Sequence, residues 1–100
     1  MFKMEMTSEE EIQAYNMVLD IVRDRVAPER ISRSSARSYM ALVLDNNPHR
    51  TSCRLYLKGN KKILGTISER KVETRNPINS IDEIARYSGD ILNTIRAYDR

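Results

Sequence analysis

The sequence predicts a single α+β domain with the order αβββα: a helix, an antiparallel meander of three to four strands, and a second helix, both helices packing on one face of the sheet. Two segments, 12–26 and 81–95, repeat apolar residues at steps of three and four, the period of an amphipathic helix. Between them, residues 31–75 change to the period of two that is typical of strands. The chain, residues 1–100, has the length of one domain.

The first helix is expected to begin at a capping box and to end before a proline. Residues 7–10 and 8–11 offer two equally good registers for the box, Thr-x-x-Glu and Ser-x-x-Glu. Because the residue before a proline is disfavoured in the α region, Pro28 places the end of the helix near residues 26–27. Residues 1–6 precede the box and are expected to be flexible.

The best-buried strand is expected at residues 38–44, where both faces are apolar and a central position in the sheet is favoured. Residues 45–48, Asp-Asn-Asn-Pro, are dense in turn formers. A second strand is expected at residues 52–57, where apolar residues alternate with Arg54 and Tyr56. This alternation predicts that one face of the sheet is exposed to solvent.

A third strand is expected at residues 62–67, after a hairpin turn at residues 58–61 whose glycine and asparagine accept positive φ. Residues 68–71 form a further reversal. A short polar strand at residues 72–75 would be the fourth, and its polarity suits an edge position.

The second helix is expected to begin at another capping box, residues 80–83. Asp82 and Glu83 also suit the positive end of the helix dipole. Gly89 in the middle of this helix costs about 1 kcal/mol relative to alanine. A close packing contact or a local bend is therefore expected there.

The composition limits where the protein works and what it holds. With 40% apolar and 31% charged residues the chain is expected to be ordered and soluble, and its single cysteine, Cys53, excludes an internal disulfide and favours a reducing compartment. Acidic residues 9–11 precede any long apolar run, which excludes an ordinary signal peptide, and no segment approaches the roughly 18 apolar residues of a membrane span. We expect a cytoplasmic protein with no membrane association and no cofactor, since a small domain has little room for a deep cavity.

Positive charge is concentrated in the middle of the sequence. Residues 1–22 carry one lysine and five acids, net −4, whereas residues 23–75 carry thirteen basic and five acidic residues, net +8. Such a block is typical of polyanion binding. The alternative is that the charges only keep strand edges and turns in solution.

Arginines and hydroxyl side chains alternate in residues 30–38, a combination suited to gripping phosphates. Tyr39 and Tyr56 would add stacking surfaces if they are exposed. No signature of a base-reading module is present, so binding is expected to be independent of sequence. The predicted nucleic-acid-binding residues are Arg30, Arg33, Arg37, Arg50, Arg54, Lys58, Lys61 and Lys62.

Two sets of residues are candidates for catalytic or metal sites. His49 and Cys53 are the only residues of their types, and neither a third catalytic group nor further metal ligands accompany them. Asp45 with Glu69 and Lys71 has the outline of the D…ExK pattern by which many nucleases hold Mg²⁺. Glu69 and Lys71 fall in an expected turn, however, so the sequence favours a protein that is not an enzyme and holds no metal.

Several short blocks of the sequence carry a family resemblance: Glu9–Asn16, Arg37–Tyr39 with Leu42–Asn47, Cys53–Tyr56, and Pro77–Ile84. Together they resemble the C-terminal portion of bacterial proteins related to type I restriction endonuclease R subunits. The resemblance implies an accessory module of a restriction-type or nucleic-acid-processing protein. In such proteins the nuclease-like region lies N-terminal to this part, so no catalytic residue is implied here.

The leading hypothesis is a non-catalytic accessory domain that associates weakly with DNA or RNA through a basic sheet surface. A protein-interaction or oligomerisation module is the alternative, indicated by a polar edge strand and by Tyr87 and Tyr98, since aromatic residues are enriched at interfaces. A small Mg²⁺-dependent nuclease is the second alternative.

Overall fold

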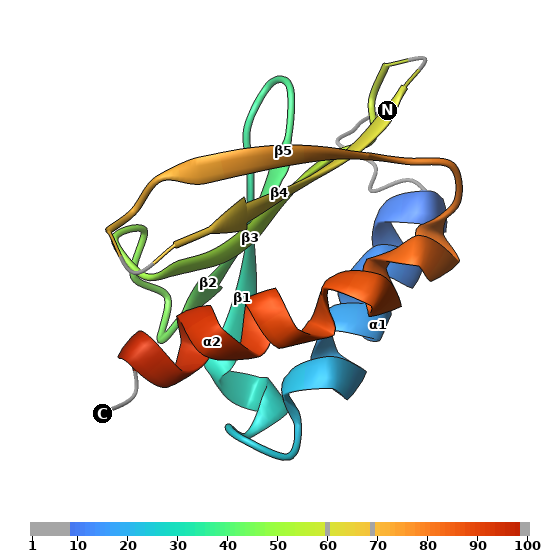
Figure 1. Cartoon of the computed structure of the whole chain (residues 1–100). Coiled ribbons are helices and arrows are strands. Elements are labelled where there is room, and N and C mark those ends of the chain that lie inside the picture. The colour runs from blue at the N-terminus through green and yellow to red at the C-terminus, as the bar shows by residue number, and fades with distance from the viewer. Residues whose placement is uncertain (1–8, 60, 69, 99–100) are drawn as a thin grey trace, which may run out of the picture.

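The computed structural model describes residues 9–59, 61–68 and 70–98. The chain forms an antiparallel sheet with two α-helices on one of its faces (Figure 1). Two short 3-10 helices, η1 and η2, accompany them. In chain order the elements are α1 Glu9–Val22, η1 Pro28–Arg30, β1 Ile31–Ser35, β2 Met40–Leu44, β3 Thr51–Tyr56, β4 Lys62–Ile67, β5 Glu73–Ile78, η2 Ile81–Tyr87 and α2 Ser88–Tyr98.

The α+β class is confirmed, but the expected sheet of three to four strands is wrong, because the sheet has five strands in the order β1-β2-β3-β4-β5. The additional strand is β1, which pairs with β2 from Ile31 opposite Leu44 to Ser35 opposite Met40. Only Ile31 of this strand is buried. A strand with one apolar residue gives little periodic signal, and the backbone ladder to β2 determines its position.

The last strand is longer than the expected residues 72–75 and continues to Ile78, whose side chain is buried. It contains Pro77, which cannot donate a ladder hydrogen bond. The strand tolerates this residue because β5 forms the edge of the sheet.

Both helices differ from expectation at their ends. Helix α1 ends at Val22 rather than near residues 26–27, although the Arg25 and Val26 amides still donate to the Val22 carbonyl and Val26 remains in the core. The expected caps of this helix, together with residues 1–6, lie outside the described residues. The helix ends where the chain must turn toward β1. Because Val26 still packs in the core, the apolar pattern of the sequence continues past the end of the helix.

The second helical segment begins as the 3-10 helix η2 and becomes α-helical at Ser88. The expected capping box is not formed: the Ser80 side chain makes no capping bond, and the Glu83 carboxylate accepts from the Asn79 amide at 3.1 Å, one residue before the expected cap. A Cβ atom on Gly89 would meet nothing within 4 Å, so the expected close packing is absent. Gly89 instead lies next to the point where the 3-10 helix becomes an α-helix, so the helix is irregular close to this glycine.

The core lies between the helices and one face of the sheet. Every residue of β2 is buried, as predicted for a central strand. Met40, Leu42 and Leu44 point to the helices, while Ala41 and Val43 point to the opposite face and are nevertheless 6% and 3% exposed. Side chains of the sheet itself therefore cover that second face.

We expect Leu42→Ala to lower the free energy of unfolding by about 2–5 kcal/mol, because it leaves a cavity between the sheet and both helices. Urea denaturation followed by circular dichroism measures the change. Ile12→Ala is the control, since the Ile12 side chain is 44% exposed on α1. A loss at residue 42 no larger than that at residue 12 would contradict the placement of the core.

Candidate nucleic-acid interface

One face of the sheet is covered by α1 and α2, and neither described helix covers the other, which we call the open face (Figure 1). Side chains alternate along a strand, so the strand register determines which residues share this face. Arg54 on β3 lies opposite Gly65 on β4, and Gly65 lies opposite Arg75 on β5. The two arginines therefore flank a glycine in one row across three strands.

Five residues of the open face, Tyr39, Arg54, Tyr56, Glu73 and Arg75, contact one another and form the open-face cluster. The Arg54 guanidinium lies 5.2 Å from the centre of the Tyr39 ring, and that of Arg75 lies 4.7 Å from the centre of the Tyr56 ring. The two rings are 5.4 Å apart and tilted by 56°. Each arginine thus stacks on one tyrosine, and the tyrosines contact each other.

The Glu73 carboxylate joins the members of the cluster. Arg54 Nη1 donates to Oε1 at 3.1 Å, the Tyr56 hydroxyl donates to Oε2 at 2.5 Å, and Arg75 Nε lies 3.8 Å from Oε1. The Glu73 side chain is only 15% exposed, whereas Arg54 and Arg75 are 33% and 63% exposed. The acid is therefore less exposed than the two arginines whose charge it compensates.

Gly65 provides the space that Glu73 occupies. A Cβ atom on Gly65 would collide with the Glu73 carboxylate, and the φ of Gly65 is not positive. The residue is therefore needed for a close approach and not for a special backbone conformation. Sequence reasoning missed both Gly65 and Glu73, although an isolated glycine inside a strand pattern is a recognised signal of such an approach.

The cluster also affects the ionisation of Tyr56. Burial raises the pKa of its phenol above the ordinary value, and the hydrogen bond to the Glu73 carboxylate raises it further. At neutral pH the phenol therefore keeps its proton and acts as a donor. The open face presents two guanidinium groups and one hydroxyl as donors around a single anion.

Of the eight basic residues predicted to bind nucleic acid, Arg54 alone belongs to the open-face cluster. Arg30 and Arg50 lie at the end of the sheet that holds the β2–β3 connection, residues 45–50. Arg30 binds the Asp45 carboxylate through two hydrogen bonds of 2.8 and 2.7 Å, and Arg50 binds it at 3.3 Å. These two charges are thus partly compensated by a neighbouring acid.

Arg37, Lys58 and Lys61 belong to the connections at the opposite end of the sheet. The β1–β2 and β3–β4 connections meet there, because the Lys58 ammonium donates to the Ala36 carbonyl at 2.9 Å. Arg37 and Lys61 are exposed. This group lies a strand length away from Arg30 and Arg50.

The remaining two, Arg33 and Lys62, point to the side of the sheet that carries the helices. The Arg33 guanidinium lies 5.2 Å from the centre of the Tyr15 ring on α1, and the Lys62 ammonium lies 3.2 Å from the Glu10 carboxylate. The structure therefore distributes the eight predicted residues over four places. It does not bring them together on one face.

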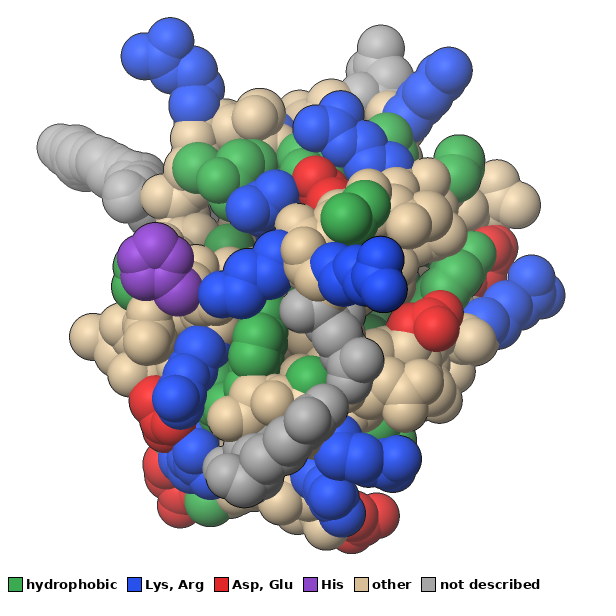
Figure 2. Space-filling view, turned by 60° about the vertical axis from the view of Figure 1, so that its left-hand side comes forward, with side chains coloured by type: hydrophobic (Ala, Val, Ile, Leu, Met, Phe, Trp, Pro, Cys, Tyr) green, Lys and Arg blue, Asp and Glu red, His purple; other side chains and the backbone are tan. Residues whose placement is uncertain are grey.

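The end of the sheet that holds Arg30 and Arg50 gains further basic groups from the β4–β5 connection. The Lys71 ammonium donates to the His49 carbonyl at 2.7 Å, which joins this connection to the one between β2 and β3. Figure 2 brings this side forward, and Lys and Arg side chains lie beside the histidine and across the centre of the view. We call this surface the basic end; it comprises Arg30, His49, Arg50, Arg70 and Lys71.

The structure describes all but one of the residues named in the catalytic alternatives. Cys53 is fully buried, and burial raises the pKa of its thiol to about 12, while His49 is exposed on a turn. Asp45 is bound by two guanidinium groups, and Lys71 donates to a backbone carbonyl; Glu69 lies outside the described residues. Among the described residues no group of three His, Cys, Asp or Glu side chains could hold a metal.

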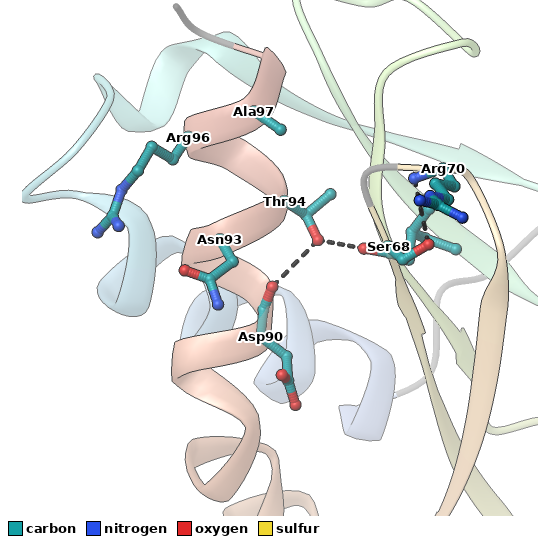
Figure 3. A pocket seen from close by; sticks show the side chains of 8 residues that line it. Ser68, Arg70, Asp90, Asn93, Thr94, Arg96 and Ala97 are labelled. Carbon is teal, nitrogen blue, oxygen red and sulfur yellow. Dashed lines mark hydrogen bonds between the residues drawn. The ribbon is translucent and has the colours of Figure 1, made fainter.

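A pocket of about 580 Å³ lies between α2 and the end of β4. The Thr94 hydroxyl lies within hydrogen-bond distance of the Ile67 carbonyl and, at 3.0 Å, of the Asp90 carbonyl (Figure 3). Arg70 and Arg96 both line the pocket, but Figure 3 shows their side chains on opposite sides of it. They do not converge on a common anion.

Comparison with known protein families and with curated proteins found no match for this chain, and comparison of its fold with solved structures found none. In the described part of the chain, no helix combines the length and the apolar character needed to cross a membrane. Any assignment of function therefore rests on the arrangement of the residues.

Asp45→Asn is expected to destabilise the fold at neutral pH. The hydrogen bonds and charge of Arg30, with that of Arg50, hold the pKa of Asp45 below its ordinary value of 3.8. A depressed folded-state pKa means that the stabilisation is complete above pH 3.8 and is lost as the pH falls through the folded-state value. The difference in urea midpoint between wild type and variant should therefore be largest at neutral pH and shrink as the pH falls below 3.8.

Asp20→Asn is the control for this measurement, since its exposed carboxylate lies 3.6 Å from a single arginine, Arg23. A difference between wild type and Asp45→Asn that stays constant with pH would show that the charge of Asp45 contributes nothing.

Proposed function

We propose that this domain associates weakly, and without sequence preference, with nucleic acid through the open face of its sheet. The observation that carries the proposal is the pair of arginines stacked on tyrosines, Arg54 on Tyr39 and Arg75 on Tyr56, on a face that neither described helix covers. Planar cationic and aromatic groups on an exposed sheet are the groups with which proteins hold nucleic-acid bases and phosphates.

The chemistry of these groups matches a nucleic acid in two ways. Every base has a flat face, so stacking on a guanidinium or a ring tolerates any sequence. Arginine also donates two parallel hydrogen bonds to a phosphate, and phosphate contacts carry no sequence information. The basic end adds positive charge at one end of the sheet through the exposed Arg70.

The affinity is expected to be low because local acids compensate much of the positive charge. Glu73 lies within the open-face cluster, and Asp45 binds Arg30 and Arg50. A central block with a net charge of +8 therefore presents fewer available cations than the sequence indicates. The resemblance to restriction-type proteins supports an accessory, non-catalytic role for this binding, as part of a larger nucleic-acid-processing system.

Fluorescence anisotropy with labelled single-stranded and duplex oligonucleotides tests the proposal. We expect binding at low salt that weakens steeply between about 50 and 200 mM salt, because each neutralised phosphate contributes about −0.9 to the log–log slope on duplex DNA and about −0.7 on a single strand. Arg75→Ala should weaken binding for all sequences and make the slope shallower by about one contact.

Arg23→Ala is the matched control, because it removes the same charge from an arginine located beyond the end of α1. Equal losses for Arg75→Ala and Arg23→Ala would mean that only net charge matters. An absence of binding to every oligonucleotide at low salt would contradict the proposed function.

A second candidate, self-association through the edge of the sheet, is supported by strand β1. This edge strand pairs regularly with β2 and contains no proline, unlike the opposite edge, β5. The tyrosines first expected at an interface do not support it: Tyr87 and Tyr98 pack against the core, and the Tyr98 hydroxyl donates to the Thr51 carbonyl at 3.0 Å.

Ser35→Pro tests this candidate, because the antiparallel pattern places the Ser35 amide on the outer side of β1. The Ala36 amide donates to the Tyr39 carbonyl, and the Arg30 carbonyl accepts from the Asp45 amide. Because hydrogen-bonded pairs alternate along an antiparallel ladder, the even-numbered residues of β1 bond to β2 and the odd-numbered ones face outward. If β1 pairs with a second copy, sedimentation velocity should give a dimer for wild type and a monomer for the variant. A monomeric wild type at high concentration would exclude this candidate.

A further inference from the structure

We infer that Glu73 is an internal counter-ion that a phosphate of the bound nucleic acid displaces, so that binding is an exchange of one anion for another on the same donors. This inference rests on the proposed function and adds how the open face is regulated. Its basis is the convergence of three donor side chains, Arg54, Tyr56 and Arg75, on one carboxylate.

A backbone phosphate can take the place of this carboxylate and accept from the same donors. The phosphodiester has one negative charge and two non-bridging oxygens, and a carboxylate likewise has one charge shared by two oxygens. Arg54 Nη1 and the Tyr56 hydroxyl donate hydrogen bonds to Glu73, and Arg75 pairs with it by charge at 3.8 Å. Guanidinium groups pair with phosphate oxygens as they do with carboxylate oxygens. The cluster is therefore assembled around an anion before any ligand arrives.

The donors are not saturated by Glu73. Arg54 Nε is buried and has no hydrogen-bond partner among the described residues. The Arg75 side chain is 63% exposed, and its Nε lies at 3.8 Å from the carboxylate, longer than a hydrogen bond. A phosphate approaching from solvent meets the exposed Arg75 first and can then compete for Arg54 and Tyr56.

The position of Glu73 in the sheet allows it to leave. It is the first residue of the edge strand β5, so its side chain can rotate outward without crossing another strand. Gly65 lets the carboxylate lie close to the β4 backbone, because it has no Cβ atom at that place. The same glycine leaves an open recess over the sheet when the carboxylate moves away.

Glu73→Gln tests the exchange, because the amide keeps the shape of the side chain and removes the charge that competes with phosphate. We expect this variant to bind a single-stranded oligonucleotide about twofold to fivefold more tightly than wild type at low salt, the range expected for loss of partly exposed ion pairs. Asp20→Asn is the matched control: it removes one negative charge next to an arginine on α1, and we expect a change below about twofold.

Gly65→Ala provides a second test that keeps the charge of Glu73. The added Cβ would force the carboxylate out of the cluster, so binding should again become tighter, although less than in Glu73→Gln. Gly59→Ala is its control, since a Cβ there meets nothing within 4 Å. Thermal unfolding of all four variants confirms that each is folded at the temperature of the binding measurement.

The outcomes separate this inference from the proposed function. Tighter binding by Glu73→Gln and by Gly65→Ala, with unchanged controls, supports the exchange. If wild type binds and Arg75→Ala weakens the binding, the proposed function is retained. If Glu73→Gln then binds no more tightly than wild type, the exchange is overturned. No binding by wild type or by Glu73→Gln overturns both.

Discussion

Burial of the sheet on both faces, although the described helices cover only one, is the constraint on which the rest of the domain depends. Strand β2, which lies between β1 and β3, is buried on both sides. Ala41 and Val43 are therefore shielded from water by neighbouring long side chains. Arg54, with an apolar stem and a charged head, and the flat rings of the two cluster tyrosines are suited to this, because they cover apolar surface while their polar ends remain near water.

Covering a sheet with an arginine that is two-thirds buried creates an electrostatic requirement. The Arg54 charge needs a partner, since a partly buried cation without one is costly. Glu73 supplies that partner from the edge strand, and Gly65 gives it room. The features that make the open face a candidate interface are thus the ones that complete the fold, and a ligand phosphate would take over a role that the protein already fills with its own carboxylate.

Net charge and interface are separate properties in this domain. The basic block of the sequence is real, but antiparallel strands send successive residues to opposite faces and successive turns to opposite ends. Arg33 and Lys62 consequently point to the helices, while Arg37 and Arg50 lie at different ends of the sheet. The candidate site depends on two arginines in one row across the strands and on the rings beneath them, a small part of the total charge.

The sequence by itself determined the class of the fold, the burial of residues 40–44 on both faces and the strand at residues 62–67, because apolar periodicity records which residues must leave water. The sequence did not predict β1, because that strand has one apolar residue. It also misplaced the end of α1, which comes four residues before the apolar pattern ends. Arg54 and Tyr56 were recognisable as the exposed side of an alternating strand. Their meeting with Glu73 over Gly65 was decided only by the tertiary structure, since strands distant in sequence come into register through backbone pairing that no local pattern specifies.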